Sequence, residues 1–185
     1  MGFFNLKQLV REELVKHATY FHGSRSLIPF KNFDNSMEGT GIVSTGKKYG
    51  GFFFTSSHEN AEYYTEWFVC RVQIGGIIPA PNHEKQPPIV MKQAGIDKRI
   101  YMIEDYLDGA VHSNIVVVPS SLTKNIKITG WEFVGDEESY FESLEQMFAL
   151  GGEQYDIENF FNMTGGGLDY ALKIPIFKKF FNSKQ

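Results

Sequence analysis

The chain is poor in cysteine, in long apolar runs and in excess charge of either sign. Its one cysteine, Cys70, has no partner within the chain for a disulfide, so nothing indicates an oxidising compartment. No apolar run reaches the roughly 18 residues of a membrane-spanning helix. The net charge of −4 argues against nucleic acid as the main partner. These absences favour a cytoplasmic protein.

Three short motifs are also missing or incomplete. Charged residues follow Phe3 and Phe4 at once, unlike a signal peptide, and Leu6 stands where a myristoylation motif needs Ser or Thr. Residues 165–167 are three glycines, but they lack the Lys-Ser/Thr of a phosphate loop. No His, Cys, Asp or Glu cluster has metal-ligand spacing, so we expect no metal.

What is present is enough chain for one core and many aromatic side chains to fill it. The 185 residues include 17 phenylalanines, and aromatic-rich chains of this length favour α+β or all-β folds. Asn5 as a cap and helical apolar spacing predict a helix over 5–17. Strands are expected at 18–21, 51–55, 67–74, 111, 115–118, 126–128 and 131–134. A helix capped by Ser56 or Ser57 and another over 91–105 are expected, with a long loop over 24–50 and irregular structure over the proline-rich 79–90.

The C-terminal part differs in charge from the rest of the chain. Residues 132–145 carry six acids and no basic residue, with apolar side chains on one helical face. The last fifteen residues carry four lysines and no acid, interleaved with aromatic residues. This tail could dock a membrane surface or an acidic partner, or it could cover an apolar face of the protein. We favour the second, because the acidic helix at 137–148 offers a partner. We therefore divide the chain into a domain over 1–135 and a helical extension over 136–185 packed on it.

Function is indicated by the block from Tyr20 to Tyr64. It opens with Tyr-Phe-His-Gly-Ser-Arg, continues about thirty residues later with Gly-Gly-Phe-Phe-Phe-Thr, and ends in an Ala-x-x-Tyr helix start. This pattern resembles the ADP-ribosyltransferase fold, in the His–Tyr–Glu clade of diphtheria toxin and the poly(ADP-ribose) polymerases. The Phe-x-x-Phe-Asp run at 30–34 is similar to small transferase domains of phages and mobile elements. The resemblance covers residues 18–130 and implies an α+β split barrel of two small antiparallel sheets around a cleft.

The resemblance assigns NAD contacts residue by residue. His22 would hydrogen-bond the ribose hydroxyls of the nicotinamide riboside, and the backbone of Gly23 would bind the carboxamide, where a side chain would block the ring. Ser24 and Arg25 would line the carboxamide and phosphate side. Tyr64 would stack on the nicotinamide ring, because a flat aromatic cation needs an aromatic face.

Two positions depart from the family pattern. The middle tyrosine is Phe53, which keeps the ring and loses the hydroxyl; it lies on the strand that ends at Thr55, and we include both in the NAD site. Ser113 or Asn114 stands where the catalytic glutamate belongs. Losing one such electrostatic contact costs about 3–4 kcal/mol. Among the nearest acids, Asp108 with the following glycine resembles the family's entry to that strand rather than the catalyst.

The resemblance therefore implies a mono-ADP-ribosyltransferase that uses NAD as a substrate, with a protein or other macromolecule as the acceptor, in a phage or bacterial effector. Two alternatives stay open: a non-enzymatic NAD or ADP-ribose binding module, and an interaction or capsid-associated scaffold. Each residue also has an ordinary interpretation. His22 could be a turn residue, Phe52–Phe54 a core strand, and only one of Tyr63 and Tyr64 can face a ligand.

Overall fold

The computed structural model describes residues 18–24, 26–33, 50–81, 84–108, 111–150 and 173–183. The helix expected over 5–17, most of the loop at 24–50, Arg25 and the glycines at 165–167 lie outside them. The described elements are β1 (Tyr20–Ser24), β2 (Gly51–Thr55), α2 (His58–Tyr63), β3 (Phe68–Ile74), β4 (Ile77–Pro79), α3 (Pro87–Asp97), β5 (Ile100–Asp108), β6 (Val111–Pro119), the 3-10 helix η3 (Ser120–Asn125), β7 (Ile126–Phe133), α4 (Glu137–Leu150) and α7 (Pro175–Ser183).

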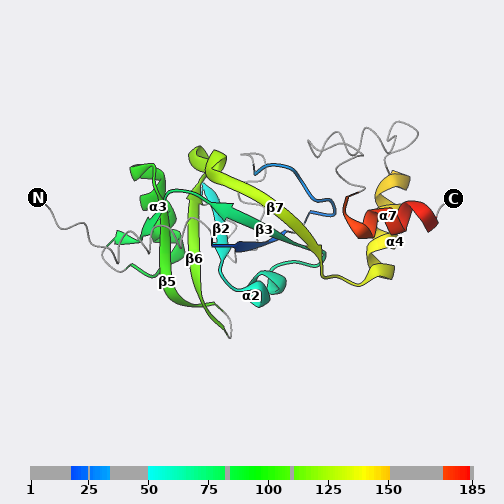
Figure 1. The fold of residues 1–185 in the computed structure, drawn as a ribbon, viewed down its shortest axis with the longest axis horizontal. Coiled ribbons are helices and arrows are strands. Elements are labelled where there is room, and N and C mark those ends of the chain that lie inside the picture. Colours follow the sequence, from blue (N-terminus) through cyan, green and yellow to red (C-terminus); the bar gives the residue numbers. More distant parts are fainter. Residues whose placement is uncertain are drawn as a thin grey trace, which may run out of the picture.

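The strands form one mixed sheet in the order β4-β5-β6-β2-β1-β3-β7 (Figure 1). The α+β class predicted from the sequence is confirmed. The described strands do not form two separate antiparallel sheets, however. They belong to a single sheet that is not closed, with β4 and β7 at its edges and a parallel pair between β4 and β5. Backbone pairing is sparse between the central strands β1 and β2, which pair only through Phe21 and Thr55.

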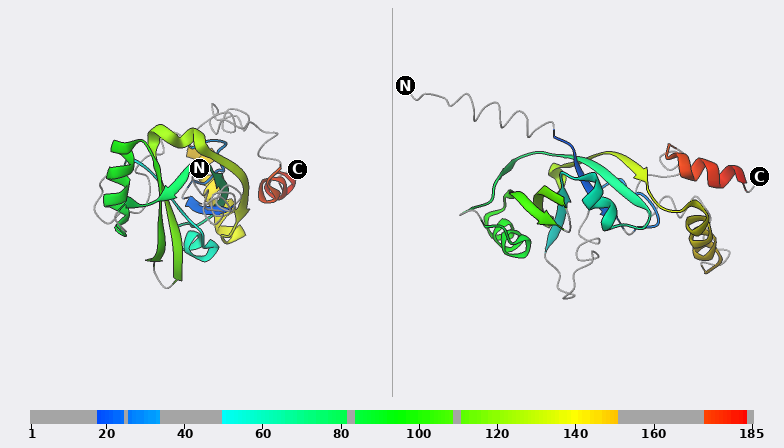
Figure 2. Two further views of the ribbon diagram at one scale, coloured as in Figure 1. Left: turned by 60° about the vertical axis from the view of Figure 1, so that its left-hand side comes forward. Right: turned by 90° about the horizontal axis from the view of Figure 1, so that it is seen from below.

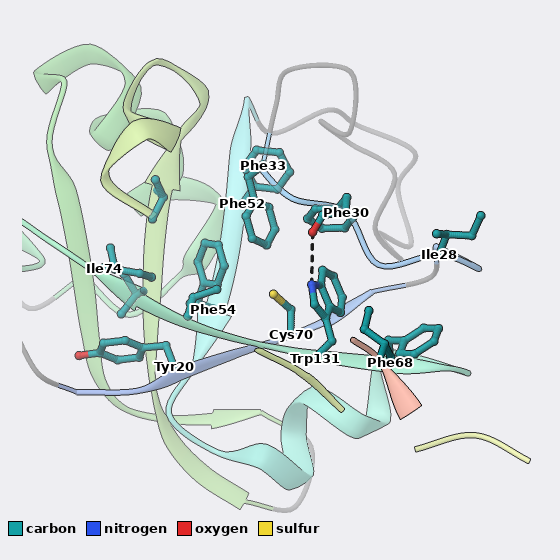
Figure 3. Close-up of a cluster of buried hydrophobic side chains, with 14 of the residues drawn as sticks. Tyr20, Ile28, Phe30, Phe33, Phe52, Phe54, Phe68, Cys70, Ile74 and Trp131 are labelled. Atoms are coloured by element: carbon teal, nitrogen blue, oxygen red, sulfur yellow. Dashed lines mark hydrogen bonds between the residues drawn. The ribbon is translucent and has the colours of Figure 1, made fainter. Parts of the chain in front are cut away.

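Two hydrophobic clusters lie on opposite faces of this sheet, because side chains alternate along each strand. On β6, Val116 and Val118 belong to the larger cluster, whereas Ile115 and Val117 belong to the smaller one under α3. The larger cluster gathers aromatic side chains from the strands and from residues 26–33 (Figure 3). There the indole nitrogen of Trp131 donates a hydrogen bond to the Phe30 carbonyl, 3.2 Å away.

The described part of the basic tail is helix α7, which lies beside α4 at the end of the molecule away from α3 (Figures 1 and 2). Phe177 of α7 is 1% exposed and packs on Tyr140 of α4 and on Phe68 of β3. Lys179 forms an ion pair with Glu137. The aromatic side of α7 therefore completes the larger cluster, and its lysines face outward.

The structure corrects the expectation for residues 79–105. The proline-rich stretch contains the start of α3, because Pro87 and Pro88 occupy the first helical turn, where a missing N–H costs nothing. The helix then ends at Asp97, with Lys98 in the left-handed conformation (φ 53°), and residues 100–105 belong to β5. The two strands expected at 126–128 and 131–134 are one strand, β7.

No helix in the described ranges has the length and apolar character needed to cross a membrane.

Candidate functional site

His22 lies at the point where β1 and β2 separate. Its ring stands 5.2 Å from the ring of Phe33 and 5.4 Å from that of Phe54. Nδ1 lies 2.9 Å from the carbonyl oxygen of Phe53, on the neighbouring strand. A carbonyl oxygen only accepts hydrogen bonds, so Nδ1 carries the proton and Nε2 of the neutral ring is an acceptor. The side chain thus links the two strands next to their single backbone pair.

The surroundings of His22 keep its ring neutral. Burial among the phenylalanines lowers the pKa of the imidazole below its ordinary value, and the hydrogen bond to Phe53 only partly opposes this shift. His22 is therefore a hydrogen-bonding group rather than a charged one near neutral pH.

Helix α2 packs directly on β1 at Gly23. The helix begins after Ser57, whose hydroxyl accepts a hydrogen bond from the Asn60 N–H, as predicted for one of the two serines. A Cβ atom at Gly23 would lie 2.2 Å from the Ala61 carbonyl oxygen and 3.1 Å from Cβ of Tyr64. Only glycine permits this approach. Gly23 and Tyr64, far apart in the sequence, are therefore in contact.

The two neighbouring tyrosines differ in orientation. Tyr63 is 79% exposed, whereas Tyr64 is half-buried and its hydroxyl donates a 2.5 Å hydrogen bond to Oδ1 of Asp108 at the end of β5. Burial first, and then this bond, raise the pKa of the Tyr64 phenol well above its ordinary value. Tyr64 thus extends from Gly23 at its Cβ to Asp108 at its hydroxyl.

Ser113 belongs to a buried polar cluster that we call the serine cluster, made of Thr55, Asn60 and Ser113. The Thr55 and Ser113 hydroxyl oxygens lie 2.9 Å apart, and the Asn60 amide donates to Ser113 at 3.0 Å and to the Val111 carbonyl at 3.2 Å. All three side chains are buried. The cluster ties α2 to β2 and β6, which gives Ser113 and Thr55 a structural role.

Asn114 is held by a different set of bonds. Its N–H donates to the Ser56 hydroxyl at 2.9 Å, and its side-chain oxygen accepts from the Asp105 N–H at 3.2 Å. Asp105 has φ 52° and lies where the β5–β6 register shifts, as in a β-bulge. The Asn114 side chain therefore supports the bulge.

The structure divides the predicted site residues between the two faces of the sheet. Gly23, Phe53, Thr55 and Ser113 alternate onto the face that α2 and α3 cover, and Tyr64 packs there. His22, Ser24 and Asn114 alternate onto the opposite face. The strand β2 also separates β1, which carries His22, from β6, which carries Ser113 and Asn114.

The remaining predicted contacts have local explanations. The Ser24 hydroxyl accepts a hydrogen bond from the Ser26 N–H at 3.2 Å, and its carbonyl accepts one from the Thr65 hydroxyl. Phe53 packs beside the cluster under α3. In the ranges that the structure describes, no three His, Cys, Asp or Glu side chains come close enough to hold a metal ion.

Sequence reasoning missed two residues that meet the predicted ones. Asn60 bonds Ser113, and its only sequence signal is its place three residues after the helix cap. Asp108 bonds Tyr64 across 44 residues, and the sequence interpretation placed it only at the entry to a strand. No protein-family model or curated protein matches the sequence, and no solved structure matches the fold, so any function must be argued from this geometry.

Proposed function

We propose that the chain binds NAD and transfers a single ADP-ribose to a macromolecular acceptor. The observation that carries this proposal is the contact between Gly23 and Tyr64, which brings together the two motifs of the ADP-ribosyltransferase resemblance. The sparse pairing of β1 with β2, through Phe21 and Thr55 alone, lies next to His22 and Gly23 and gives room for a ligand to approach them.

Because His22 lies on the opposite face of the sheet from Gly23 and Tyr64, the proposal requires NAD to pass between β1 and β2 where these strands separate. Each residue then has a defined task. The neutral His22 accepts a hydrogen bond from a ribose hydroxyl at Nε2, while Phe53 fixes the tautomer through Nδ1. Tyr64 offers its ring to the nicotinamide, and the Gly23 backbone lies beside it. Ser24 and Arg25 follow on the phosphate side. The bond between the ribose C1′ and the pyridinium nitrogen breaks, and nicotinamide leaves with the electron pair. A nucleophilic atom of the acceptor bonds to C1′, and its proton, where it has one, passes to solvent.

Calorimetry with NAD and incubation with labelled NAD and candidate acceptors test the proposal. His22→Ala should abolish binding. Since the ring packs on Phe33 and Phe54, His22→Phe should also be made, because it keeps the aromatic volume and removes the nitrogens. His58→Ala, at a half-buried histidine of α2 that pairs with Glu62 and Glu132, is the control and should bind NAD normally. No binding of NAD by the wild-type chain would refute the proposal.

A second candidate function is binding of NAD or ADP-ribose without a reaction. It is favoured because Ser113 and Asn114, at the position of the family's acid, are neutral and form hydrogen bonds that support the fold. Binding with no transferred label would establish this second function. If transfer occurs, Asn114→Ala should leave binding intact and lower the transfer rate, whereas an unchanged rate would show that Asn114 does not occupy the acid position.

The proposed setting is a phage or bacterial effector acting in a host cytoplasm, which rests on the resemblance alone. Labelling of a host lysate would look for the acceptor.

A further inference from the structure

We propose that the outer side of helix α3 docks the protein onto an anionic lipid surface. Two isoleucines would enter the interfacial region of the membrane, and the basic side chains beside them would bind the headgroups. We call this surface the α3 face, and it is made of the exposed residues Ile89, Lys92, Ile96, Lys98 and Arg99. The proposal goes beyond the proposed function and does not depend on NAD binding.

The α3 face exposes large aliphatic side chains to water. Ile89 is 48% exposed and Ile96 is 66% exposed. They are seven residues apart, so they lie two turns apart on the same side of the helix. The opposite side, which packs on the sheet, is also apolar and contains Val90, Met91 and Ala94. A helix that is apolar on both sides is normally covered on both, which makes the α3 face a candidate contact surface.

Basic side chains accompany these isoleucines. Lys92 is exposed and lies between them on the same side of the helix, three residues after Ile89 and four before Ile96. Lys98 and Arg99 are exposed where the helix ends. The α3 face therefore combines an aliphatic ridge with three positive charges, in a chain whose net charge is −4.

The acids nearest to α3 in the sequence have local partners. Asp97, the one acid within the helix, accepts hydrogen bonds from the Tyr101 hydroxyl at 2.6 Å and from the Gln93 amide at 2.8 Å. Glu84, which precedes the helix, accepts one from the Gln86 N–H at 2.8 Å. The acidic helix α4 lies at the opposite end of the molecule (Figures 1 and 2). Its carboxylates would therefore be held away from a lipid surface at α3.

This composition fits an anionic lipid surface better than a protein partner. Protein interfaces are depleted in lysine and enriched in aromatic residues, whereas the α3 face contains two lysines and no aromatic residue. A second copy of the chain is disfavoured by charge. An antiparallel pairing that joined Ile89 of one copy to Ile96 of the other would bring the two Lys92 side chains together at its centre. Anionic headgroups instead attract each basic residue, by about fivefold in affinity, while aliphatic side chains bury at the acyl boundary.

Co-sedimentation with lipid vesicles tests the proposal on the full chain. The wild type should bind vesicles of phosphatidylcholine and phosphatidylserine in equal amounts, and it should not bind vesicles of phosphatidylcholine alone. High salt should release it, because salt screens the attraction between the lysines and the headgroups. Equal binding to the two kinds of vesicle, or binding to neither, would overturn the proposal.

Two variants, each with a matched control, test whether the α3 face makes the contact. Ile96→Ser should weaken binding to the anionic vesicles by about tenfold, because it removes an aliphatic group that enters the interface. Lys92→Gln should weaken it by about fivefold, because one positive charge is lost. Leu107→Ser, at an exposed leucine of β5, and Lys127→Gln, at an exposed lysine of β7, should both stay within about twofold of wild type. If the control variants weaken binding as much as the α3 variants do, the α3 face is not the docking surface.

Light scattering of the protein without vesicles examines the alternative of a protein interface. The wild type should have the mass of one chain. A dimer that Ile96→Ser converts to a monomer would make the α3 face an interface between copies and would overturn the lipid proposal. Failure of vesicle binding leaves the proposed NAD site untouched, and failure of NAD binding leaves this inference untouched.

Discussion

His22 makes the stability of this protein depend on pH in a defined direction. Its folded pKa is lowered by burial, while an unfolded histidine titrates near about 6.5. Between those two values the unfolded chain binds more protons, so stability rises with pH. The contribution of His22 is thus complete above about pH 6.5 and is lost as the pH falls through the folded pKa.

NMR titration of the His22 ring should therefore give a midpoint below about 6.5. The free energy of unfolding, measured in urea at a series of pH values, should fall less steeply towards acid in His22→Phe than in wild type. A midpoint at or above the ordinary value would contradict the neutral ring on which the proposed ribose contact depends.

The serine cluster should contribute to stability through hydrogen bonds that water cannot replace. Thr55→Val keeps the side-chain shape but removes the hydroxyl. The Ser57 N–H then loses its acceptor, and the Ser113 hydroxyl loses one of its two hydrogen-bond partners in the cluster. We expect a loss of about 1–3 kcal/mol in the free energy of unfolding, measured in urea. Thr129→Val is the same change at an exposed hydroxyl that bonds the Arg71 carbonyl, and it should cost less than about 0.5 kcal/mol. Equal losses would show that burial of the cluster is unimportant.

At the scale of elements, the contact of α2 with β1 depends on the absence of a side chain at Gly23. Gly23→Ala would place Cβ against the backbone of α2, so the helix must move, at a cost of about 1–3 kcal/mol. Gly95→Ala, in α3, meets no atom within 4 Å and should stabilise by up to about 1 kcal/mol. Thermal unfolding of both variants measures these opposite signs. If the site needs the Gly23–Tyr64 contact, Gly23→Ala should also weaken NAD binding, and Gly95→Ala should not.

Local sequence signals predicted the elements whose determinants are local. The aromatic run of β2 and the serine cap of α2 were placed correctly, because strand propensity and capping act within a few residues. The strand β5 was missed, because its Ile-Tyr-Met-Ile start pairs with β6 and α3 covers it, contacts that the sequence does not display. The same limit applies to the site. The sequence motif contained Gly23 and Tyr64, and Asp108 was assigned only to the entry of a strand, because its hydrogen bond to the Tyr64 hydroxyl depends on how the sheet folds.

At the scale of the molecule, the clusters on the two faces share one sheet. Strands β5 and β6 contribute alternate residues to both, and α7 completes the larger cluster at the opposite end from α3. The Tyr140 hydroxyl on α4 also donates a hydrogen bond to the Leu27 carbonyl at 2.6 Å. Leu27 belongs to the same segment as Phe33, whose ring contacts the ring of His22. The C-terminal helices thus support the candidate site indirectly, and we expect the described elements to unfold in one transition.

Phe177→Ala tests whether the described elements unfold in one transition, because Phe177 lies at the end of the molecule away from α3 (Figure 1). Removing this fully buried ring leaves a cavity against Phe68 and Tyr140 and should cost about 3–5 kcal/mol. Tyr63→Ala, at an exposed aromatic, is the control and should change stability by less than about 0.5 kcal/mol. If the molecule is one cooperative unit, native-state hydrogen exchange should show the same loss of protection at Val90 and Met91 in α3 as in α7. Unchanged protection in α3 would instead make the C-terminal helices a separately unfolding unit, because the cavity would then destabilise only the elements that touch it.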